Sequence, residues 1–191
     1  MLTKRYILHL SRAKGIARRY FVTNGFDGAL TMLGLMMAFS MSEDAALPVA
    51  IQACFGAAIA LGMSGMSSAY LSEAAERKKE LQELEQALLT DLSASDHGKA
   101  SRYLPIVVAL VNGLSPLVIS LIIITPLWLA EQGMNLGMQP FLFAMLVSIF
   151  VIFLLGIVLG RLSREFWLWT GLRTLAVAGL TILIIYFFNK Y

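Results

Sequence analysis

The sequence predicts an all-α integral membrane protein with five transmembrane helices, its N-terminus in the cytoplasm and its C-terminus outside. Of the 191 residues, 58% are hydrophobic and 14% are charged, whereas a soluble domain is closer to half apolar and a quarter charged. The charges are clustered, which leaves apolar stretches of the roughly 20 residues that a helix needs to cross a bilayer. The lysines and arginines also concentrate in alternate segments between those stretches.

The chain divides into four parts. Residues 1–19 form a basic segment that is either an amphipathic helix at the membrane surface or a basic cytoplasmic tail. Residues 20–71 hold the first two transmembrane helices. A short polar loop of helix-forming composition, with both acidic and basic residues, follows at 72–102 and is expected in the cytoplasm. Residues 103–188 hold the last three transmembrane helices.

The distribution of positive charge sets the predicted orientation. The spans are expected at about 20–41, 48–71, 103–129, 139–160 and 166–188. This arrangement places every lysine and arginine except Lys190 on the inner side, if Arg173, in the first third of the last span, is counted there, as the positive-inside rule requires. The compact loops and the lack of a targeting sequence favour a prokaryotic plasma membrane.

Several classes of function leave no trace in the sequence. There is no basic stripe interleaved with aromatic residues, so nucleic acid is not an expected partner. We find no nucleophilic triad pattern, phosphate-binding loop or Cys/His cluster, and therefore expect neither an enzyme nor a prosthetic group. The single cysteine, Cys54, lies in an apolar run and is expected to be an inert buried thiol.

Asp27 is the only acid within a predicted span. It lies about 10 Å inside the membrane at 1.5 Å per residue, where a carboxylate costs about 2.5 kcal/mol or more. We therefore expect it to face a cavity or a partner, and to act as a metal ligand and proton-coupling group. The alternative is that the first span begins at Asp27, which would then cap the helix.

Methionines are concentrated in the first two spans. Met63 and Met66 are three residues apart and are expected to share a face of the second span. A thioether is a soft ligand that suits transition metals, so both are candidate metal ligands. The usual role of a methionine in an apolar helix is packing, and that alternative remains open.

Four glutamates follow the second span at a spacing that aligns them on one helical face. They form a candidate metal-collecting ridge and are Glu73, Glu76, Glu80 and Glu83. Basic residues fall between them at Arg77, Lys78 and Lys79. A solvated helix with internal ion pairs explains the same pattern about as well.

Two further patterns concern helix shape. Asn112, Gly113 and Pro116 interrupt the third span and are expected to kink it, although a carbonyl freed by the proline is an alternative ion ligand. Gly156 and Gly160 form a G-x-x-x-G pair, which lets helices approach closely.

Three stretches resemble the vacuolar iron transporter family. They are RRYFVTNGFDGALTMLGLMMAF, GAAIALGMSGMSSAYLSEAAER and GIVLGRLSREFWLWTGLRTLAVAGL. The resemblance implies a homodimer that exchanges Fe²⁺ or Mn²⁺ for protons along a path lined by the first helices. It further implies that Asp27 is the pore carboxylate and that the second-helix methionine is Met63 or Met66.

The chain departs from the family pattern in two places. The second span has no acid within 52–58, where the family usually has a glutamate, and the cytoplasmic metal-binding domain is reduced to the polar loop. The expected function is export of Fe²⁺, Mn²⁺ or another divalent transition metal from the cytoplasm by proton antiport. The alternative is a membrane scaffold or assembly protein that transports nothing.

Overall fold

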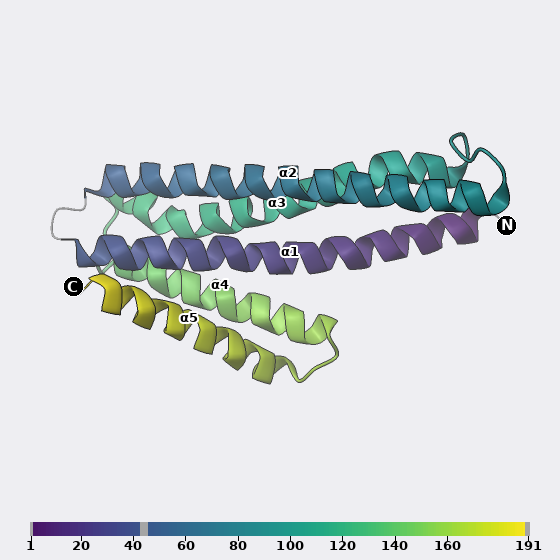
Figure 1. Ribbon diagram of the computed structural model, residues 1–191. Coiled ribbons are helices and arrows are strands. Elements are labelled where there is room, and N and C mark those ends of the chain that lie inside the picture. The colour runs from purple at the N-terminus through teal and green to yellow at the C-terminus, as the bar shows by residue number, and fades with distance from the viewer. Residues whose placement is uncertain (1, 43–45, 190–191) are drawn as a thin grey trace.

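The computed structural model describes the backbone of residues 2–42 and 46–189; in the first range, side chains are described at residue 15 and from residue 18 onward. These residues form five helices: α1 (Leu2–Met41), α2 (Leu47–Leu88), α3 (Asp96–Glu131), α4 (Pro140–Leu162) and α5 (Trp167–Asn189). No strand occurs among them, so the predicted all-helical fold is confirmed. Successive helices run in opposite directions, and α1 to α3 extend well beyond the turn that joins α4 to α5 (Figure 1).

Four described helices, α2 to α5, are long and apolar enough to cross a membrane. They support the class of a multi-pass all-α membrane protein. Helix α1 is not among them, because it carries Asn24 and Asp27 within its more apolar half.

The expected segment boundaries fall inside continuous helices. Residues 2–19 of the basic segment and the expected span 20–41 belong to one helix, α1. In addition, the polar stretch 72–102 is mostly a continuation of the membrane helices, because α2 runs on to Leu88 and α3 begins at Asp96. The cytoplasmic loop predicted from composition is therefore a helical hairpin with a short turn.

Local capping explains why that hairpin turns where it does. Leu89 adopts a left-handed conformation with φ of 49°, and Thr90 N donates to the Glu85 carbonyl at 3.3 Å, which ends α2. Ser95 then caps α3, because its hydroxyl accepts from Gly98 N at 3.2 Å.

Helix α3 lies between α1 and α2, and glycines bring the backbones together. A Cβ added to Gly28 of α1 would lie 2.8 Å from Pro116 Cα, and one added to Gly62 of α2 would lie 3.1 Å from the Gly113 carbonyl oxygen. Such close approach replaces the hydrophobic effect as the driving force for helix association in lipid. The predicted interruption at Asn112, Gly113 and Pro116 is thus a packing segment inside a continuous helix.

Helices α4 and α5 pack through the predicted glycine pair. A Cβ on Gly156 would lie 3.0 Å from Gly171 Cα, and one on Gly160 would lie 2.9 Å from Trp167 Cα. The expectation that Gly156 and Gly160 serve close helix packing is confirmed.

Substitution of Gly113 by alanine tests the packing of α3 against α2. The new methyl group would lie 2.8 Å from Met66 Cβ and closer still to the Gly62 carbonyl oxygen, so we expect a loss of about 1–3 kcal/mol from overpacking. Gly179→Ala is the control, since its Cβ position has no heavy atom within 4 Å and alanine favours a helix. Thermal unfolding in detergent measures both, and equal melting temperatures for the two variants would contradict the packing.

Candidate functional site

Side-chain amides join three helices within the apolar part of the bundle. Asn112 Nδ2 of α3 donates to the Gly65 carbonyl of α2 at 2.7 Å, and Asn112 Oδ1 accepts from Asn24 Nδ2 of α1. Asn24 Nδ2 also donates to the Tyr20 carbonyl at 2.9 Å. Asn112 is only 6% exposed, and a buried amide needs such partners. The network holds α1, α2 and α3 in register.

A second polar contact joins α1 to α3 one turn away. The Ser115 hydroxyl, which is fully buried, donates to the Phe21 carbonyl. Neither Asn24 nor Ser115 is among the residues predicted from the sequence to matter for function. A usable signal was present, because Asn24 and Asn112 are both amides in apolar segments, and polar side chains there tend to bond across helices.

Asp27 lies one turn along α1 from Asn24, with its side chain exposed on the surface of the bundle. The next two residues, Gly28 and Ala29, are buried. No described residue forms an ion pair or hydrogen bond with the Asp27 carboxylate. The alternative that a helix begins at Asp27 is wrong, because α1 is continuous through this residue.

The two candidate methionines differ in their surroundings. Met66 is half-buried and packs between the helices, where its Cε would lie 3.1 Å from a Cβ built on Gly113. Met63 is 57% exposed. Although the pair was expected to share a face, packing occupies Met66 and leaves the Met63 thioether accessible.

Asp27 and Met63 lie at nearly the same depth in the bundle. Asn112 bonds to both Asn24 and Gly65, which makes those two residues level. Asp27 follows Asn24 by three residues and Met63 precedes Gly65 by two. Because α1 and α2 run in opposite directions (Figure 1), both are displaced the same way along the bundle, by about 4.5 Å and about 3 Å.

Ion pairs occupy most of the glutamate ridge on α2. The Arg77 guanidinium bridges Glu73 at 3.2 Å and Glu80 at 2.6 Å, and Lys79 lies 3.8 Å from Glu83. Burial lowers the pKa of Arg77, but the Glu80 and Glu73 carboxylates raise this pKa by more, so the net shift is upward. These contacts match the alternative of an ion-paired helix, whereas metal collection by the ridge stays a prediction.

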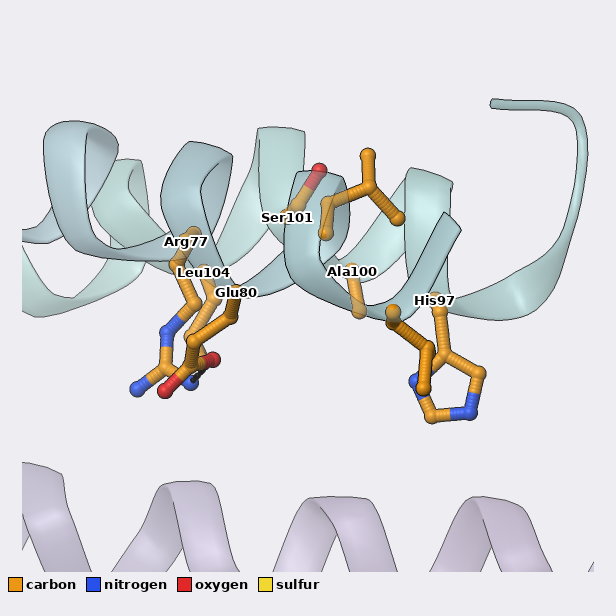
Figure 2. A pocket seen from close by; sticks show the side chains of 8 residues that line it. Arg77, Glu80, His97, Ala100, Ser101 and Leu104 are labelled. Atoms are coloured by element: carbon orange, nitrogen blue, oxygen red, sulfur yellow. Dashed lines mark hydrogen bonds and ion pairs between the residues drawn. The ribbon is translucent and has the colours of Figure 1, made fainter. Parts of the chain in front are cut away.

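The fourth member of the ridge, Glu76, is exposed. Nearby, a hollow opens between α2 and α3, and Figure 2 shows Arg77, Glu80 and His97 extending to the same side of these two helices. Across the described residues, no three His, Cys, Asp or Glu side chains are placed to hold a metal ion. The structure therefore does not bring Asp27 together with the glutamates.

The chain is similar to an uncharacterized protein of Methanocaldococcus jannaschii. The two are 28% identical over 175 residues, and the match covers 90% of this chain and 88% of the relative. No protein-family model and no solved structure matches the chain. The relative has no described activity, so the likeness carries no function.

A double-mutant cycle on Asn24→Ala and Asn112→Ala tests the amide network. Each single variant should lower the free energy of unfolding. The double variant should lose less of this free energy than the two single variants lose in total. We expect a coupling energy of about 0.6–1.7 kcal/mol, the range for polar contacts between membrane helices. Thr125→Val is the control. It also removes a polar group from α3, but the Thr125 hydroxyl donates to a carbonyl of its own helix and so does not join two helices. Strictly additive losses would rule out a direct bond between the amides.

Proposed function

We propose that this protein is a homodimeric transporter that exports Fe²⁺ or Mn²⁺ from the cytoplasm in exchange for protons. In this proposal all five helices cross the membrane, the N-terminus is cytoplasmic and the C-terminus is outside. The sequence resemblance to vacuolar iron transporters and the distribution of lysine and arginine support it. The archaeal source of the relative agrees with a prokaryotic plasma membrane.

The observation that carries the proposal is the uncovered, unpaired carboxylate of Asp27. Its side chain is exposed on the bundle surface, and no described residue neutralises it. In a bilayer, a carboxylate at this position is unfavourable unless a cation, a proton or a partner meets it. A visiting divalent cation that alternates with a proton satisfies this requirement.

In the proposed homodimer, a second copy of the chain covers the bundle surface on which Asp27 is exposed. Helix α2 presents exposed small residues at four-residue intervals, at Gly56, Ala60 and Ser64, a spacing that lets membrane helices approach. Met63 lies beside this stripe and is exposed as well. Two copies would bring two carboxylates and two thioethers to one path, which provides the set of ligands that a single chain lacks.

The proposed cycle uses the charge of Asp27 directly. A divalent cation enters from the polar ends of α2 and α3, attracted by exposed carboxylates such as Glu76. It binds the ionised Asp27 and the Met63 thioether, a ligand that suits a transition metal better than Mg²⁺ or Ca²⁺. A proton arriving from outside then neutralises Asp27 and releases the metal outward. Return of the proton to the cytoplasm restores the ionised carboxylate.

Asp27→Asn tests the carboxylate at nearly constant shape. In proteoliposomes with an imposed pH gradient, Mn²⁺ flux should fall about tenfold or more, which corresponds to about 1.4 kcal/mol. Glu131→Gln, which removes an exposed carboxylate at the far end of α3, should leave the flux unchanged. Undiminished flux in the Asp27→Asn variant would remove this residue from the mechanism.

Leucine substitutions at the two methionines should have different effects in a parallel experiment. Met63→Leu keeps the volume but removes an exposed thioether, so we expect slower Mn²⁺ flux with little change in melting temperature. Met66→Leu alters a packed side chain, so we expect its main effect on melting temperature, within about 1.5 kcal/mol of unfolding free energy. The reverse pattern would assign the ligand role to Met66.

A second candidate is a membrane scaffold that transports nothing. The ion pairs of Glu73, Glu80 and Glu83 favour it, because paired carboxylates are less available to a metal. Reconstituted protein without Mn²⁺ or Fe²⁺ flux, and without metal binding by calorimetry, would support this alternative over the transporter.

A further inference from the structure

The turn between α4 and α5 carries a concentrated positive charge. Arg161 lies in the last turn of α4, Arg164 lies in the turn and Arg173 lies in the first half of α5, and all three are exposed. Glu165 is the one acid of the turn, which leaves a net charge of +2. In Figure 1 this turn stands apart from the other helix connections.

Two of these arginines lie over tryptophan rings. The Arg161 Cζ lies 6.0 Å from the centre of the Trp167 ring, and the Arg173 Cζ lies 5.5 Å from that of Trp169. Such cation–π contacts use the charge of the guanidinium and none of its hydrogens. The N–H groups of a guanidinium form a fork that matches a phosphate.

Arg164 has a backbone conformation that glycine would adopt more easily. Its φ is 57°, in the left-handed region that is unfavourable for residues with a Cβ. The adjacent hydrogen bond, from Glu165 N to the Gly160 carbonyl at 2.9 Å, is typical of a helix end where glycine is usual. No described residue pairs with the Arg164 side chain. Local stability therefore does not explain an arginine here.

Glu165, the acid of the turn, forms only a long ion pair and a long hydrogen bond. Glu165 lies 3.6 Å from Arg173 and 3.4 Å from the Thr170 hydroxyl, and both charged side chains are more than half exposed. An exposed pair of this kind contributes little. A stronger anion can therefore displace Glu165 from Arg173.

Apolar side chains surround the charged groups. Phe166 is 66% exposed and Leu172 is 55% exposed, and both tryptophans are also accessible. Tryptophan is typical of the boundary between headgroups and acyl chains. A ligand that satisfies this surface has an anionic head and an apolar body.

We propose that the α4–α5 turn binds the phosphate headgroup of an anionic phospholipid. The guanidinium N–H groups of Arg161, Arg164 and Arg173 hold the phosphate, while the tryptophan rings and Phe166 contact the upper acyl chains. The site is independent of the proposed metal path, because it uses neither Asp27 nor Met63. Clusters of basic residues at this depth favour anionic lipids over neutral ones.

The test uses the full chain in a neutral detergent, titrated with phosphatidylglycerol, phosphatidylcholine or inorganic phosphate. Melting temperature and tryptophan fluorescence are the readouts. We expect saturable changes with phosphatidylglycerol and much smaller ones with the other two. An equal response to phosphatidylcholine would overturn the proposal, and an equal response to inorganic phosphate would replace the lipid with a free anion.

Variants of the turn sharpen the test. Arg164→Gly relieves the left-handed backbone and removes the charge, so it should melt higher without lipid and bind phosphatidylglycerol about tenfold more weakly, the scale of one charge-assisted hydrogen bond. Glu165→Gln should bind more tightly, since it removes the competing carboxylate. Arg102→Gln, at an exposed arginine of α3, should bind as the parent does. An equal loss of affinity for phosphatidylglycerol in Arg102→Gln and Arg164→Gly would mean that binding depends on overall positive charge. That result would overturn the proposed site.

Discussion

The hydrogen bonds of one buried amide hold the three long helices in register. Asn112 bonds to Asn24 of α1 and to the Gly65 carbonyl of α2. Lipid provides no hydrophobic drive for helices to associate, so close packing and polar contacts must do so. The segment from Asn112 to Pro116 supplies both, because its backbone lies against glycines of both neighbours.

This arrangement determines which surfaces remain for function. Helix α1 packs against α3, α4 and α5, whereas α2 packs mainly against α3. Asp27 and Met63 remain exposed in this packing, and the amide network makes them nearly level. A bare carboxylate next to hydrocarbon is unfavourable by about 2.5 kcal/mol or more. Under the proposed function, a partner or an ion would therefore have to complete the site that the single chain leaves open.

The helical class and the apolar stretches of α2 to α5 could be predicted from the sequence, because runs without charge have few alternative explanations. The span expected at 20–41 lies in α1, which is not among the helices apolar enough to cross a membrane. The sequence predicted side-chain orientation poorly. In a membrane helix both the buried and the lipid-facing sides are apolar, so periodicity does not distinguish Met63 from Met66. The actual difference depends on Gly113, which lies on another helix. The glutamate pattern was ambiguous for a different reason, since the same spacing serves a cation ridge and a set of ion pairs.

Helix α2 is unbroken from Leu47 to Leu88 and so connects the membrane interior to the polar end of the bundle. A rigid rod of this kind behaves as a lever when it rests on a close contact such as that between Gly62 and Gly113. A tilt of α2 about this contact would move the Arg77 end and the Leu47 end in opposite directions, with no change in secondary structure.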